Sequence, residues 1–143
     1  MAALTKGKTR KYEVNPASFI QPFEVAASTE IFAGSLVCVN ASGYLVNAID
    51  TASFRFIGIA NQDIDNSSGG NGDLSCDVRI NTREWMTKTT PTVADLGKAV
   101  SIVDTDTVQV SLGTNVKALG IVVKYSTTEV LVQFDISIQE VLA

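Results

Sequence analysis

Two apolar runs flank a cluster of turn residues in EIFAGSLVCVNASGYLVNAI, which spans residues 30–49. The runs are Glu30–Val39 and Tyr44–Ile49, and the turn residues between them read NASG. Apolar runs of this length, joined by Asn, Ser and Gly, are typical of a β-hairpin. This stretch indicates the fold class, because similar runs recur along the rest of the chain.

Short apolar runs alternate with turn clusters at intervals of about 8–12 residues. No segment shows the 3.6-residue period of an amphipathic helix. Further strands are predicted at Phe19–Ala26, Phe54–Ala60, Leu74–Met86, Ala99–Val103, Thr107–Leu112, Ala118–Lys124 and Thr128–Ile136. The expected fold is all-β: a small antiparallel β-barrel or sandwich of about eight strands, with at most one short helix.

Prolines and glycines refine these assignments. Pro22 makes the first run an edge strand, and Gly58 indicates a bulge or a close backbone neighbour within its strand. Residues 91–97 (PTVADLG) predict a short helical turn that Gly97 ends. The apolar core is predicted to contain the following residues, about a quarter of which we expect at the surface or in an interface: Leu36, Val37, Val39, Leu45, Phe56, Ile57, Val78, Ile80, Val100, Ile102, Val108, Ile121, Val123, Val130, Val132 and Phe134.

Charge is distributed unevenly along the chain. Residues 1–11 (MAALTKGKTRK) carry four cations and no acid, whereas the whole chain has a net charge of −4, so the remaining residues carry −8. We expect an extended N-terminal arm over residues 1–15, too polar to fold alone and ordered by docking on a neighbouring subunit, and one β domain over 16–143. The predicted partner-binding residues of the arm are Leu4, Lys6, Lys8, Arg10, Lys11 and Tyr12.

Two other interpretations of the arm stay open: contact with nucleic acid, and a solvated terminus without a function. The acidic body argues against nucleic-acid binding by the domain itself.

The composition offers little for catalysis. The chain contains no histidine, and Cys38 and Cys76 lie too far apart for a CxxC pair, so a zinc site and the commonest general base lack support. We expect a protein that is not an enzyme and has no cofactor. Both cysteines are expected as buried thiols, although a disulfide between them stays open. With no apolar run long enough for a signal peptide or a membrane span, we expect synthesis in a cytoplasm and no membrane contact.

Three parts of the sequence are candidates for a metal, catalytic or binding site. The stretch Asp63–Asp73 (DIDNSSGGNGD) could offer oxygens to calcium, but an EF-hand register puts Ser68 and Leu74 where glycine and glutamate belong. We therefore expect a flexible, metal-free loop. Asp104 and Asp106 are read as a hairpin turn and not as paired catalytic carboxylates. Trp85 could stack on a carbohydrate, anchor an interface or close one end of the core.

Several stretches carry a family resemblance: MAALTKGKTRKYE, IFAGSLVCVNASGYLVNA, FIGIANQDIDNSSGGNGD, ADLGKAVSIVDTDTVQV and ALGIVVKYSTTEVLVQF. In order and spacing they resemble the capsid decoration (cement) proteins of tailed bacteriophages. The most specific parts are the A-G-x-L-V-x-x-N-x-x-G-Y element, Ala33–Tyr44, and the glycine-rich element from Gly58 to Gly72.

The resemblance implies a structural protein on the exterior of the virion capsid, made in the host cytoplasm. It also implies homotrimers at three-fold or quasi-three-fold positions that clamp the major capsid protein, with no direct contact to nucleic acid. The alternatives are a carbohydrate- or receptor-binding β-module of a phage tail or fibre, and a carboxylate hydrolase.

Overall fold

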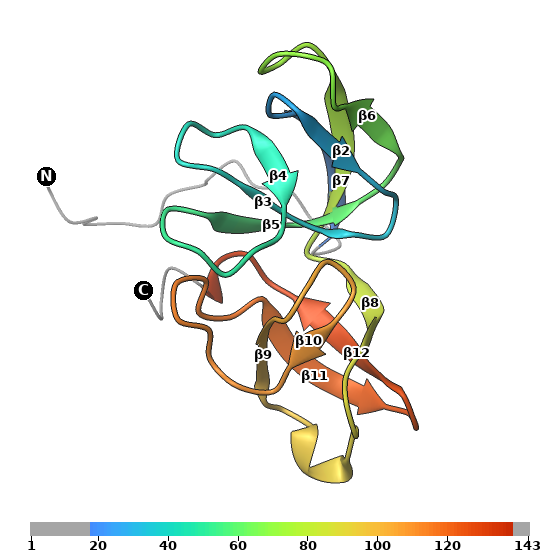
Figure 1. Ribbon diagram of the computed structural model, residues 1–143. Coiled ribbons are helices and arrows are strands. Elements are labelled where there is room, and N and C mark those ends of the chain that lie inside the picture. The colour runs from blue at the N-terminus through green and yellow to red at the C-terminus, as the bar shows by residue number, and fades with distance from the viewer. Residues whose placement is uncertain (1–17, 139–143) are drawn as a thin grey trace, which may run out of the picture.

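The computed structural model describes residues 18–138, and this part of the chain is almost entirely β-structure (Figure 1). The elements are β1 (Phe19–Glu24), β2 (Thr29–Ile31), β3 (Leu36–Val39), β4 (Leu45–Asn47), β5 (Arg55–Ala60), β6 (Ile64–Asn66), β7 (Ser75–Ile80), β8 (Arg83–Thr87), the 3₁₀ turn η1 (Val93–Asp95), β9 (Ala99–Ile102), β10 (Val108–Gln109), β11 (Gly120–Tyr125) and β12 (Glu129–Phe134). The all-β prediction is confirmed. The strands are shorter and more numerous than the eight or so expected.

Two five-stranded antiparallel sheets and one two-stranded ribbon make up the described body. The first sheet has the order β1-β7-β5-β3-β4, the second has the order β10-β9-β11-β12-β8, and β2 pairs with β6. Each large sheet curls until its first and last strands come together: Val25 forms a bridge with Leu45, and Thr87 forms one with Thr107. Figure 1 shows the two sheets stacked, the first above the second.

Two predicted strands are each divided in two. Glu30–Val39 is interrupted at Gly34, which has a φ of 87°, so that β2 joins the ribbon and β3 joins the first sheet. Leu74–Met86 is interrupted at Asn81, which has a φ of 56°, so that β7 lies in the first sheet and β8 in the second. A single residue with left-handed backbone redirects the chain without changing the polarity pattern around it.

Several local predictions are confirmed. β3 and β4 pair as a hairpin, and β1 lies at the edge of the first sheet. The predicted helical turn is η1, followed by Gly97 with a φ of 79°. Around Gly58, the pairing of β5 with β3 shifts by one residue, and a Cβ at Gly58 would overlap the carbonyl oxygen of Arg79 on β7. Gly58 therefore has both a bulge and a close backbone neighbour.

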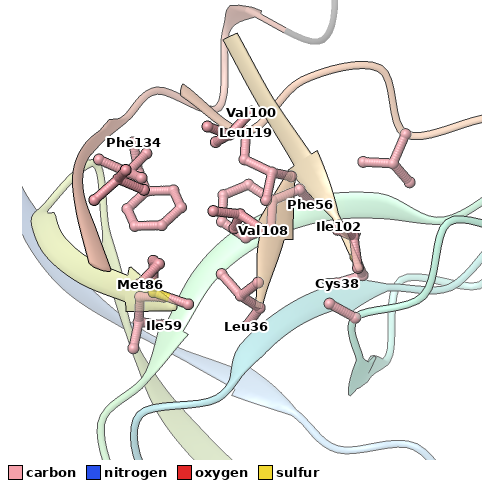
Figure 2. Packing of buried hydrophobic residues seen from close by; sticks show 14 of the residues in the cluster. Leu36, Cys38, Phe56, Ile59, Met86, Val100, Ile102, Val108, Leu119 and Phe134 are labelled. Carbon is pink, nitrogen blue, oxygen red and sulfur yellow. The ribbon is translucent and has the colours of Figure 1, made fainter. Parts of the chain in front are cut away.

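Two apolar clusters lie on opposite faces of the first sheet. One contains Val37 and Val39 of β3 and lies on the inner, concave face of the curled first sheet. The other joins Leu36 and Phe56 of the first sheet to residues of the second (Figure 2). The rings of Phe56 and Phe134 meet there with their centroids 5.5 Å apart. Because strand side chains alternate between faces, the consecutive apolar residues of β3 serve both clusters.

Most of the predicted core residues are buried. Ile57 is partly buried and packs against the cluster inside the first sheet. Ile121 and Val123 are each 38% exposed, so the assignment of these two residues to the core is wrong. Val122 faces the core instead, and the pairing of β11 with β12 shifts between Val122 and Lys124. In a run of Ile and Val the alternation cannot show which residues point inward, and a bulge changes the register again.

Candidate interaction surfaces

The predicted arm and its binding residues cannot be placed. Residues 1–15, with Leu4, Lys6, Lys8, Arg10, Lys11 and Tyr12, lie outside the described residues. The other candidate residues lie within the described part of the chain: the aspartates have structural roles, and Trp85 is exposed.

The stretch Asp63–Asp73 is not a free loop, because its first residues include β6, which pairs with β2. Its oxygens hold backbone N–H groups. Asp63 Oδ1 accepts from Ala33 N at 2.7 Å, Asp65 Oδ1 accepts from Ser67 N at 3.0 Å, and Asp73 Oδ2 accepts from Gly70 N at 2.8 Å. These carboxylates serve three separate turns and do not converge. Within residues 18–138, no cluster of three or more acidic or cysteine side chains could hold a metal ion.

Asn66 organises this stretch and was missed in the sequence. Its side chain is buried, and Nδ2 donates to the carbonyl oxygens of Ala26 at 2.9 Å and Gly70 at 3.0 Å. A buried amide whose donors are satisfied by main-chain carbonyls fixes both segments. The glycine-rich turn is therefore tied to the chain that follows β1.

Asp104 and Asp106 lie in a hairpin turn between β9 and β10, as predicted. Asp104 Oδ1 accepts from the backbone N–H groups of Asp106 and Thr107, both at 2.8 Å. The hydrogen bond from the Asp106 N–H is the main reason why the pKa of Asp104 lies below its ordinary value. An aspartate held ionised by turn N–H groups is a turn residue and a poor proton donor at neutral pH.

Asp50, just beyond β4, is a residue that the sequence analysis overlooked. Its carboxylate accepts hydrogen bonds from Thr114 N at 2.8 Å, Asn115 N at 2.7 Å and Val116 N at 2.8 Å. Burial alone would raise the pKa of Asp50, but these three N–H groups and the charge of Lys117 outweigh it, so the pKa is lowered. Asp50 thus links the β4–β5 connection to the loop before β11.

Cys38 and Cys76 are buried free thiols. Cys38 belongs to the cluster between the two sheets, and Cys76 belongs to the cluster inside the first sheet. The open question of a disulfide is thereby answered, because the two sulfurs lie on opposite faces of one sheet. Burial raises the pKa of Cys38 to about 12 and also raises the pKa of Cys76, so neither thiol is a nucleophile at neutral pH.

Trp85 lies on the outward side of the second sheet and is 45% exposed, so it does not close the core. In register, Trp85 pairs with Leu131 of β12, and Leu131 pairs with Lys124 of β11. Ile121 and Val123, the two residues wrongly assigned to the core, are exposed on the same strand β11. We call Trp85, Leu131, Ile121 and Val123 the outer-face patch.

A second surface feature is an open groove of about 610 Å³ between the first and second sheets, which we call the inter-sheet groove. Three of its lining side chains are large, apolar and more than half exposed: Phe32, Ile49 and Val103. Three acids, Glu30, Asp50 and Asp104, also line it. Among the residues that the structure describes, no lysine or arginine contributes to this lining.

Comparisons with known proteins identify no relative: no family model, no curated protein and no solved structure matches the chain. In the described part of the chain, no helix is long and apolar enough to cross a bilayer.

Proposed function

We propose that this chain is a capsid decoration (cement) protein: a structural virion protein that binds the outer surface of an expanded phage head and stabilises adjacent subunits of the major capsid protein. It acts as a homotrimer at three-fold or quasi-three-fold positions, is made in the host cytoplasm, and is not an enzyme. Three things support this proposal: the sequence resemblance, the all-β body and the charge contrast between arm and body.

The observation that carries the proposal is the outer-face patch. It joins a half-exposed tryptophan to neighbouring apolar residues on a sheet face, and Arg83 adjoins it on β8 with its Nε 2.6 Å from Gln133 Oε1. Tryptophan and arginine in one apolar patch are the composition of protein-interface hot spots. An exposed apolar area on the outer face of a sheet suits contact with another protein surface.

The mechanism requires no chemistry. A protein that binds only the geometry of the expanded shell stabilises that state by linkage, by an amount that grows with its concentration relative to its dissociation constant. Arm and body are two attachment points on one chain, and docking the first raises the effective concentration of the second. Repeated over a lattice, weak contacts of this kind hold the shell together.

Cosedimentation with emptied heads of the encoding phage tests the proposal. We expect the protein to pellet with expanded heads and not with unexpanded heads. Equal binding to both forms, or binding to neither, would overturn the proposal.

Two variants locate the contacts. Deleting residues 1–11 removes four cations and should weaken binding to expanded heads in a salt-dependent way. Trp85→Ala should weaken binding about tenfold or more if the tryptophan is a hot spot. The matched control is Val93→Ala, which shortens an exposed apolar side chain on η1. Undiminished affinity of the truncated protein at physiological salt would make the arm a passive terminus.

The exposed Trp85 also favours a second candidate, a carbohydrate- or receptor-binding β-module, because a half-exposed indole can stack on a sugar ring. Quenching of Trp85 fluorescence by host-surface polysaccharide, without binding to heads, would favour this alternative.

A further inference from the structure

The inter-sheet groove brings exposed apolar side chains and acidic side chains together in one hollow. Phe32, Ile49 and Val103 come from three separate connections, after β2, β4 and β9, and they are 58%, 56% and 53% exposed. Large apolar side chains that converge on one hollow surface mark a binding site for another chain.

The negative charge of the groove favours a positively charged ligand. Glu30, Asp50 and Asp104 give it a negative lining, and Asp50 and Asp104 are kept ionised by backbone N–H groups. A fitting ligand is an extended, basic segment with one or two apolar anchors. Residues 1–12 of this chain carry four cations together with Leu4 and Tyr12.

We propose that the inter-sheet groove of one copy receives residues 1–12 of a second copy of this chain. The inference rests on the proposed function, which places copies side by side, and it names the surface that the arm binds. The position of the groove fits a contact between copies. Val25, directly after β1, bridges in parallel to Leu45 of β4, and the groove lies beyond the C-terminal end of β4. The arm joins β1 at its opposite end, Phe19, and so enters the domain on the side away from its own groove.

A photo-crosslinker in the groove tests this with the full chain and without phage heads. Phe32→p-benzoylphenylalanine puts the reactive group among the exposed lining residues, and Val93→p-benzoylphenylalanine is the control outside the groove. The protein, at about millimolar concentration and low salt, is a 1:1 mixture of ¹⁴N- and ¹⁵N-labelled copies. Crosslinked peptides are identified by mass spectrometry.

We expect Phe32 crosslinks to residues 1–12, with half of the products joining one labelled and one unlabelled chain, and no such crosslinks from Val93. Products within single chains alone would overturn the assignment to a second copy. A Phe32 probe that does not crosslink to residues 1–12 would overturn docking in the groove.

Charge reversal provides an independent test. Glu30→Lys should lower the crosslink yield about threefold at low salt, because it replaces attraction with repulsion in an exposed setting. The matched control, Glu24→Lys on exposed β1, should leave the yield unchanged. Equal effects of the two variants would contradict docking in this groove. Because no head is present, these results stand apart from the cosedimentation experiment, and either proposal can fail alone.

Discussion

At the scale of single residues, the aspartates of this protein act mainly as anchors for backbone N–H groups. Asp50, Asp63, Asp65, Asp73 and Asp104 each accept at least one such bond. This role explains why an acidic chain with a D-x-D-N loop has no converging metal site in its described part. In the D-x-D-N loop each carboxylate is held by the N–H group of a different segment, so the three are not brought together around one cation.

Asp50 should make stability depend on pH. Its pKa is lowered in the folded state, so its stabilisation is present above the unfolded value, about 4, and is lost as pH falls through the lower folded value. Asp50→Asn should therefore lower the free energy of unfolding by about 1–2 kcal/mol at pH 7 and flatten its dependence on pH below 4.

Urea denaturation between pH 2 and pH 7 measures the effect of Asp50→Asn. The control is Asp106→Asn, where Oδ2 accepts from the Thr87 hydroxyl at a longer 3.3 Å. An equal loss in both variants would show that the three N–H bonds to Asp50 have no special weight.

The loop Asp63–Asp73 gives a prediction about metal removal. Because its carboxylates hold separate turns, we expect EDTA to leave the melting temperature unchanged and calcium chloride not to raise it. Differential scanning calorimetry of the purified protein measures both. A fall of several degrees on adding EDTA would reveal a cation that the turn geometry does not anticipate.

At the scale of elements, β5 depends on the absence of a side chain at Gly58. β5 lies between β7 and β3, and Gly58 comes so close to Arg79 that a Cβ would overlap its carbonyl oxygen. The main-chain carbonyl of Arg79 cannot move aside as a flexible side chain could, because it belongs to the neighbouring strand β7. Gly58→Ala should therefore lower the free energy of unfolding by about 1–3 kcal/mol.

Gly70→Ala is the matched control for Gly58→Ala, because a Cβ there would meet its nearest neighbour, the Asp73 carboxylate, at an ordinary 3.6 Å. We expect it to change stability by less than about 0.5 kcal/mol. Chemical denaturation compares the two variants, and similar values would mean that β5 and β7 can separate slightly at little cost.

At the scale of the whole molecule, one apolar cluster joins the two sheets, and the Phe56–Phe134 ring pair spans their boundary (Figure 2). Phe134→Ala removes a fully buried ring and should destabilise the protein by about 3–5 kcal/mol. Denaturation monitored through Trp85, which lies in the second sheet, should show one transition shifted to lower urea.

The control for Phe134→Ala is Phe32→Ala, in which the lost ring is mostly exposed and the expected change is within about 0.5 kcal/mol. Combining Phe134→Ala with Phe56→Ala should cost less than the two losses added, because the rings contact each other. Full additivity would indicate that the contact between the rings contributes nothing of its own.

Much of the local structure follows from the sequence alone. Period-2 alternation and turn residues are short-range signals, so the β class, the β3–β4 hairpin, the turn ended by Gly97 and the close approach at Gly58 could all be predicted. The composition, with no histidine and no CxxC pair, likewise disfavours a zinc site.

Tertiary structure alone decided the pairings and the surfaces. Local pattern does not specify which strand lies beside which, that β7 and β8 belong to different sheets, or that Val122 and not Ile121 points inward, because each depends on contacts between distant segments. For the same reason, neither Asp50 reaching the loop before β11 nor the inter-sheet groove could be anticipated. Both are made by residues that only folding brings together.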